Sequence, residues 1–304
     1  MRTVYLGTSE FAVEVLERLA ATPHRPVLAV TRPDRPRGRG RSLQSPPVAA
    51  RAALLGVETI QPEDVNSEQA RQAIAAAEPE AVVICAYGAL VKEPLLSAHD
   101  MLNVHPSLLP RWRGAAPIER AIEAGDEETG VTIMRPIAEL DAGPTCLQRS
   151  EPIAPDDNYG SLAGRLAALG GELLVEALDT QPAFREQPDQ GVTYADKIEP
   201  EDRLLDPARP ADQLERRARA LTPHIGAYVP LDGGERLGVR RVALAAGVDD
   251  IAPGELVERE SGLLYGAAQG ALQLIEVQPP GKRPMEASAW LRGRAGRGQT
   301  LDGR

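Results

Sequence analysis

Three short runs within the first 87 residues are apolar at consecutive positions, not only at every second position. They span residues 3–6 (TVYL), 26–30 (PVLAV) and 80–87 (EAVVICAY). A strand needs this pattern when helices cover both faces of its sheet, as in a buried parallel sheet. After the first run, Ser9 is a candidate helix cap, and apolar residues follow it at helical spacing up to Leu19. We therefore expect an α/β fold with a doubly wound, mostly parallel, Rossmann-like sheet that ends near the helix predicted at 161–177.

The pattern changes in the last third of the chain. One amphipathic helix is predicted at 211–220. Short strand-like segments follow it, separated by glycine-containing turns, at 227–231, 237–244, 254–257, 263–265 and 271–277. Several short strands with such turns are typical of a small all-β module. We expect a smaller C-terminal β-barrel domain of the OB-like kind.

The length of the chain and one polar stretch predict where the domains divide. A chain of 304 residues exceeds the usual length of one domain. Residues 181–190 are polar and contain two prolines, which favours a linker. We predict one domain at 1–183, a linker at 184–203 and a second domain at 204–304.

The charge of the chain is unevenly distributed. A net charge of −10 argues against a surface that binds nucleic acid uniformly, yet residues 204–304 contain 14 Lys and Arg against 13 Asp and Glu. The segment 32–41 is strongly basic, with a single Asp34 against Arg32, Arg35, Arg37, Arg39 and Arg41. Its Gly and Pro content disfavours a regular helix, and phosphates could order its guanidinium groups. A solvated surface loop explains the same residues equally well.

Several classes of protein are disfavoured. No segment approaches the roughly 20 apolar residues that span a bilayer, and the N-terminus lacks the apolar region of a signal peptide. We therefore expect a cytoplasmic protein without a membrane partner. The two cysteines, Cys85 and Cys146, are too few for a disulfide framework or a four-ligand zinc site, and we expect no metal. The turn at 7–10 lacks the G-x-G-x-x-G pattern, which disfavours NAD binding.

Two places in the chain carry side chains suited to chemistry. Asn103 and His105 leave the end of a predicted strand, where open α/β sheets bind ligands, and residues i and i+2 of a strand share a face. Asp141 precedes a Gly-Pro turn after another predicted strand at 129–134. Taken alone, a His before Pro106 and an Asp before a Gly-Pro turn are more often ordinary turn residues.

Longer motifs around these residues change that balance. The segments NVHPSLLPRWRGAAPIERAI at 103–122, GDEETGVTIM at 125–134 and LDAGP at 140–144 resemble the active-site signature of the 10-formyltetrahydrofolate-dependent formyltransferases. The basic segment at 32–41, YADKI at 194–198 and GKR at 281–283 are similar to the branch of that family that formylates methionyl-tRNA. Pro106 after the His, and PHIG at 223–226, depart from the pattern of that branch.

The resemblance implies an activity and a set of site residues. The chain would transfer a formyl group from 10-formyltetrahydrofolate to the amino group of methionyl-tRNA in translation initiation, as a monomer. Asn103 and protonated His105 would stabilise the oxyanion, and Asp141 would orient the His and accept a proton by relay. An alternative is a sugar-nucleotide N-formyltransferase with the same donor.

The resemblance also implies where the two substrates bind. The folate would contact Tyr87, Gly88, Leu90, Ser107, Leu108, Leu109 and Pro110. The acceptor arm of the tRNA would contact Arg35, Arg37, Arg39, Arg41, Lys282 and Arg283. The N-terminal domain would then be catalytic, and the C-terminal domain would bind tRNA.

Overall fold

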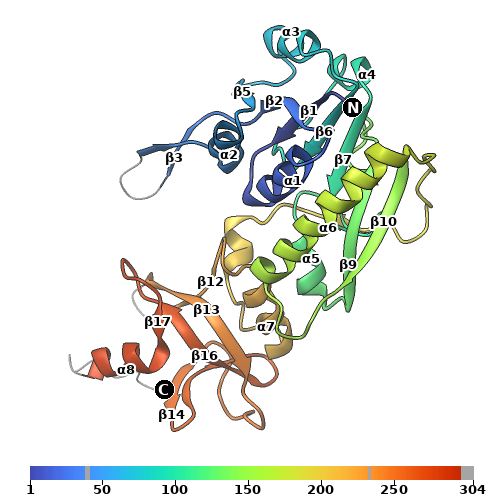
Figure 1. Ribbon diagram of the computed structural model, residues 1–304. Helices are drawn as coiled ribbons and strands as arrows, with labels where there is room; N and C mark the ends of the chain where they lie inside the picture. The colour runs from blue at the N-terminus through green and yellow to red at the C-terminus, as the bar shows by residue number, and fades with distance from the viewer. Residues whose placement is uncertain (38–41, 232–233, 296–304) are drawn as a thin grey trace. The chain divides into compact units, whose positions relative to one another are not determined.

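The computed structural model describes residues 1–37, 42–231 and 234–295 (Figure 1). It divides into two compact units. The first comprises Met1–Pro117, Glu128–Pro152 and Ala163–Ala195, and the second comprises Ile118–Glu127, Ile153–Leu162 and Asp196–Arg304. Among the helices of the described ranges, none has the length and apolar character that crossing a bilayer requires.

The first unit is built on a seven-stranded sheet, as Figure 1 shows in part. Its spatial order is β10 (Thr145–Pro152), β9 (Glu128–Met134), β7 (Met101–His105), β6 (Ala81–Cys85), β1 (Thr3–Gly7), β2 (Pro26–Val30) and β5 (Glu58–Ile60). The strands from β7 to β5 are parallel, whereas β9 is antiparallel to both of its neighbours. The predicted doubly wound, mostly parallel sheet is confirmed.

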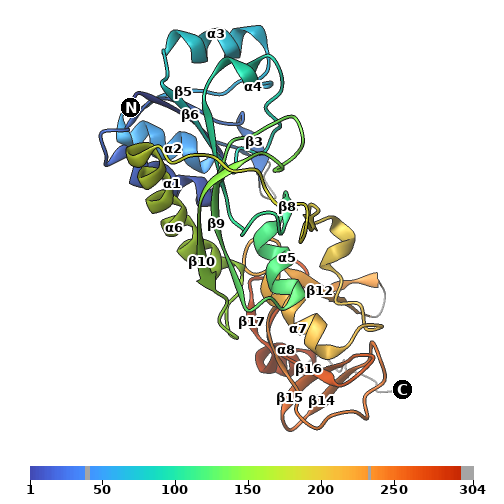
Figure 2. The ribbon, with the colours of Figure 1, turned by 90° about the vertical axis from the view of Figure 1, so that its right-hand side faces the viewer.

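Helices cover both faces of this sheet. One face buries Val4 and Leu6 of β1 in a cluster with Ile74 of α3 (Glu68–Ala76) and Leu95 of α4 (Leu95–Ala98). On the other face lie α1 (Glu10–Ala20), α2 (Pro47–Leu55) and most of α6 (Tyr159–Thr180), which runs beside β9 and β10 in Figure 2. Glycine at position 170 lets α6 approach the sheet, because a Cβ there would lie 2.9 Å from Val104 Cγ1.

The second unit contains an antiparallel sheet of six strands. Its order is β12 (Ala227–Pro230), β13 (Arg236–Leu244), β16 (Ala271–Gln278), β15 (Gly262–Gly266) and β14 (Leu256–Arg259), with β17 (Met285–Glu286) paired to β16. Helix α7 (Ala211–Ala220) packs on it through buried Leu214 and Ala218, and α8 (Ala287–Ala295) through Trp290 and Leu291. The unit also includes most of α5 (Pro117–Ala124). The predicted antiparallel β domain is confirmed, and its closure into a barrel stays a prediction.

The last residues of the first unit are tied to its site region. Arg185 exchanges two backbone hydrogen bonds with Thr145, at 2.8 and 2.9 Å. Further along, β11 (Tyr194–Ala195) pairs in parallel with β8 (Arg113–Gly114). Residues 184–195, which the sequence predicts as the first part of a linker, therefore belong to the first unit.

Cys85 at the end of β6 provides a test of this core. Its thiol is fully buried, and burial raises its pKa to about 12 against an ordinary value of 9.0. Because the thiolate is the reactive form, native Cys85 should resist iodoacetamide at about pH 8, whereas partly buried Cys146 reacts faster. The stability that the neutral Cys85 thiol contributes is complete below the unfolded pKa and is lost as the pH rises toward 12.

Mass spectrometry of the alkylated peptides, before and after unfolding, measures both thiols. Unfolding should make the two cysteines react equally. Fast alkylation of Cys85 in the native protein would contradict the packing described here.

Candidate active site

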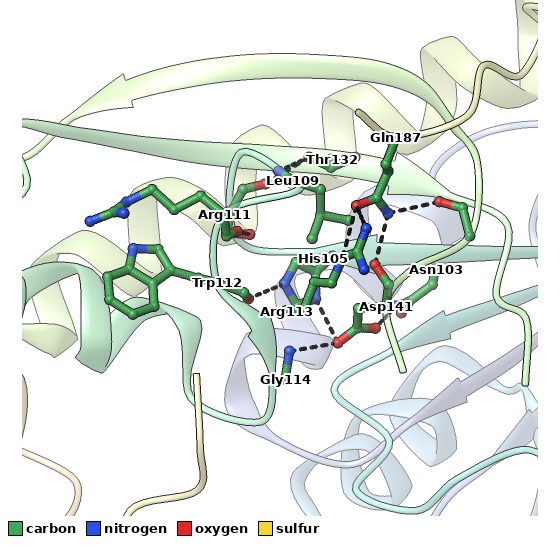
Figure 3. Close-up of polar contacts among 12 residues, drawn as sticks. Asn103, His105, Leu109, Arg111, Trp112, Arg113, Gly114, Thr132, Asp141 and Gln187 are labelled. Atoms are coloured by element: carbon green, nitrogen blue, oxygen red, sulfur yellow. Dashed lines mark hydrogen bonds and ion pairs between the residues drawn. The ribbon is translucent and has the colours of Figure 1, made fainter. Parts of the chain in front are cut away.

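The structure brings Asn103, His105 and Asp141 together (Figure 3). Asn103 and His105 lie on β7, and Asp141 lies in the turn that follows β9. Asn103 Nδ2 is 3.4 Å from Asp141 Oδ1, and His105 Nδ1 is 3.6 Å from Asp141 Oδ2. The side chains of His105 and Asp141 are only 5% and 11% exposed, so solvent screens their interaction weakly. Strand periodicity thus places the amide and the imidazole on one side, as the sequence predicts.

The backbone at Trp112 fixes the orientation of the imidazole. His105 Nε2 lies 2.9 Å from the carbonyl oxygen of Trp112, and because a carbonyl only accepts, Nε2 carries a proton. A second proton on Nδ1 would point toward the Asp141 carboxylate. Trp112 has a φ of +63°, a region that costs a non-glycine residue about 1 kcal/mol. In Figure 3 its ring points away from His105, so this strained residue serves the site through its carbonyl.

Asp141 is held from two sides. The backbone N–H of Gly114 donates to Asp141 Oδ2 at 2.9 Å. Gln187 Nε2 donates to the carbonyl oxygens of Asp141 and Gly143, at 2.7 and 2.8 Å. Gln187 Oε1 accepts from Arg113 Nε at 3.0 Å and from Arg113 Nη2 at 2.8 Å. Sequence reasoning missed Gln187 and Arg113, because a glutamine in a polar stretch carries no pattern.

The segment 107–110 is fixed by buried hydrogen bonds. Ser107 is fully buried and its hydroxyl donates to the carbonyl of Arg111 at 2.6 Å. Thr132 Oγ1 donates to the Ser107 carbonyl at 2.7 Å and accepts from Leu109 N at 3.2 Å. The side chains of Ser107 and Leu109 therefore face the protein interior, whereas Leu108 and Pro110 are partly exposed.

The other segment predicted to bind folate is the turn after β6. Tyr87 is 2% exposed, burial raises the pKa of its phenol, and its carbonyl accepts a hydrogen bond from Thr8 Oγ1 at 2.7 Å. The Asn66 side chain holds the turn with two hydrogen bonds. Its Nδ2 donates to the carbonyl of Leu90 at 3.0 Å, and its Oδ1 accepts from the N–H of Lys92 at 2.7 Å. Leu90 itself is 58% exposed and is available to an apolar ligand surface.

The basic residues predicted to bind tRNA are only partly described. Arg35 lies on β3 (Arg35–Arg37), which forms a hairpin with β4 (Ser42–Gln44), and its guanidinium is 3.1 Å from Glu63 Oε2. Arg39, Arg41 and the side chain of Arg37 lie outside the described residues. Lys282 and Arg283 are exposed in the second unit.

Comparison with known proteins matches both parts of the chain. The family model described as formyl transferase matches residues 1–178, and the model described as formyl transferase, C-terminal domain, matches residues 197–295. A methionyl-tRNA formyltransferase of Methylococcus capsulatus is 43% identical over 310 residues, covering 99% of both chains. One of Cereibacter sphaeroides is 43% identical over 301 residues, covering 96% of both. The chain belongs to the methionyl-tRNA formyltransferase family.

Among solved structures, this member of the methionyl-tRNA formyltransferase family shares its fold with HypX from Aquifex aeolicus in complex with tetrahydrofolic acid. The TM-score is 0.68 at 18% identity, and the match covers 99% of this chain and 48% of HypX. A likeness at this identity concerns the fold alone.

The geometry in this formyltransferase family member suits acyl transfer. The Asn103 amide N–H and the Nδ1 atom of His105 lie beside the Asp141 carboxylate, while His105 Nε2 is held by the Trp112 carbonyl and Asp141 Oδ2 by the Gly114 N–H. Fixed donors of this kind stabilise an oxyanion, and an imidazole next to a carboxylate can move a proton. Among the residues that the structure describes, no group of three or more His, Cys, Asp or Glu side chains is placed to hold a metal ion.

Proposed function

We propose that the chain transfers the formyl group of 10-formyltetrahydrofolate to the amino group of methionyl-tRNA, in the cytoplasm and for translation initiation. The observation that carries this proposal is the convergence of Asn103, His105 and Asp141 at the end of β7. The names of the relatives, which match over the whole length, support methionyl-tRNA as the acceptor.

The proposed reaction needs no nucleophilic side chain. The neutral methionyl amine attacks the formyl carbon and a tetrahedral oxyanion forms. Asn103 Nδ2 and the Nδ1–H group of protonated His105 donate to that oxygen, while His105 Nε2–H stays on the carbonyl of Trp112. The bond between the formyl carbon and the folate nitrogen then breaks. Asp141 accepts the proton of the amine by relay, and His105 delivers one to the leaving nitrogen, so the proton count balances.

The folate would lie between the two segments described above. The exposed side chain of Leu90 offers it an apolar contact, and the braced turn at 87–90 offers backbone groups for hydrogen bonds. Leu108 and Pro110 would contribute partly exposed surface, while Ser107 and Leu109 would act by fixing the backbone.

The acceptor is tested by a direct comparison. Purified protein is given formyl-labelled 10-formyltetrahydrofolate with either methionyl-tRNA or an amino-sugar nucleotide. We expect rapid label transfer to methionyl-tRNA and none to the sugar nucleotide. Transfer to the sugar nucleotide alone would overturn the proposed acceptor and leave the donor chemistry intact.

The basic segment should set the affinity for tRNA. Replacing Arg37, Arg39 and Arg41 with Gln should raise the KM for methionyl-tRNA and leave the KM for folate unchanged. Each lost phosphate contact should reduce the slope of log KM against log salt concentration by about 0.7 to 0.9. An Arg25→Gln variant, at an exposed arginine outside the basic segment, serves as the matched control. Unchanged tRNA kinetics at two salt concentrations would refute this role.

A further inference from the structure

We propose that Gln187 is a positioning residue for Asp141, and that Arg113 holds Gln187 in place. The inference rests on the proposed function, because it gives Asp141 a part in formyl transfer. It assigns a role to a residue that the sequence places in a predicted linker.

The Gln187 side-chain amide makes four hydrogen bonds at once, two as donor and two as acceptor. Its nitrogen donates to the carbonyl oxygens of Asp141 and Gly143, and its oxygen accepts from the Nε and Nη2 groups of Arg113. Rotating the amide by half a turn would set its NH₂ against the guanidinium and its oxygen against two carbonyls. The four hydrogen bonds therefore allow only one orientation of this amide. Figure 3 shows Gln187 with its dashed contacts to Arg113 and to the turn at Asp141.

The turn that carries Asp141 needs such a support. Asp141 has a φ of +50°, which a non-glycine residue keeps only when its surroundings hold it. Gly143 packs against the chain so closely that a Cβ there would lie 2.0 Å from the carbonyl oxygen of Arg135. Because Gln187 binds the carbonyls at 141 and 143, it fixes both sides of this turn and with them the direction of the Asp141 carboxylate.

Three consecutive residues connect this support to the rest of the site. The carbonyl of Trp112 accepts from His105, the side chain of Arg113 holds Gln187, and the N–H of Gly114 donates to the Asp141 carboxylate. Arg113 is only 8% exposed, so water cannot readily replace Gln187 as the hydrogen-bond partner of its guanidinium. The same short segment thus positions the imidazole through Trp112, the Asp141 carboxylate through Gly114, and the backbone carbonyl of Asp141 through Arg113 and Gln187.

Loss of the Gln187 amide should misplace Asp141 without changing substrate contacts. We expect Gln187→Ala to lower kcat by about 10²-fold, the effect of a displacement near 1 Å at a reacting group, with both KM values within about threefold. Gln187→Glu should lower kcat by as much, because the glutamate keeps an acceptor for Arg113 but places a second oxygen against the carbonyls of Asp141 and Gly143. Gln190→Ala, an exposed glutamine of the same segment, is the matched control and should keep full activity.

A double-mutant cycle separates positioning from general stability. In an Asp141→Ala background, measured by single-turnover transfer of labelled formyl, Gln187→Ala should cost less than about threefold, because residues that act as a unit are not additive. Equal losses in both backgrounds, or a Gln187→Ala variant as active as Gln190→Ala, would overturn the inference. If Gln187→Ala is unfolded at the assay temperature, the same comparison with Gln187→Glu decides. A wild-type protein without formyl transfer would instead refute the proposed function.

Discussion

Replacing His105 with alanine should lower kcat for formyl transfer by on the order of 10²- to 10⁴-fold, the range for loss of a positioned general acid or base. Of the described groups in contact with Asp141, the imidazole is the one that can move a proton between nitrogen atoms during the reaction. The imidazole also donates a hydrogen bond from Nε2 to the carbonyl of Trp112, so its ring is already oriented before substrate binds. The measurement is kcat at saturating folate and methionyl-tRNA.

His99→Ala provides the matched control for this substitution. His99 lies just after α4 and is partly exposed, away from the Asn103, His105 and Asp141 contacts. It should leave kcat unchanged, and thermal unfolding of both variants reports whether the fold is intact. A folded His105→Ala protein with kcat near that of the wild type would remove His105 from the mechanism.

Replacing Asn103 with alanine should lower kcat by on the order of 10²- to 10³-fold, as loss of one oxyanion donor does. The KM values should change little, because the bond to the oxyanion exists only in the transition state. Asn103→Asp keeps the size of the side chain but removes its N–H donors and adds a charge beside Asp141. It should therefore be at least as inactive as Asn103→Ala. An active Asn103→Asp variant would show that donation from this side chain is not needed.

Much of the fold was predictable because burial leaves a simple pattern. The continuous apolar runs correspond to β1, β2 and β6, and the periodic segment after Ser9 corresponds to α1. Strand β10 was not predicted, because it is mostly polar and exposed at the edge of the sheet, with no repeating apolar position. Helix α8 was also missed, since few large apolar side chains anchor it, Trp290 and Leu291 among them.

The site was predictable only where local geometry decides it. Asn103 and His105 share a strand, so their common direction follows from strand periodicity alone. That Asp141 joins these two residues follows only from the family resemblance, because Asp141 is 38 residues from Asn103 in the sequence. Gln187 is 46 residues from Asp141 and 74 from Arg113, and neither its residue type nor its spacing marks it. Contacts of this kind depend on the folded path of the chain and leave no local signal.

The proposed mechanism requires Asn103, His105 and Asp141 to face the formyl group. A crystal structure of the protein with a stable formylated folate bound tests this directly. We predict that the formyl oxygen lies about 3 Å from Asn103 Nδ2, on the side of β7 where His105 meets Asp141. A folate bound elsewhere in the chain, or a formyl group turned away from these three side chains, would contradict the assignment.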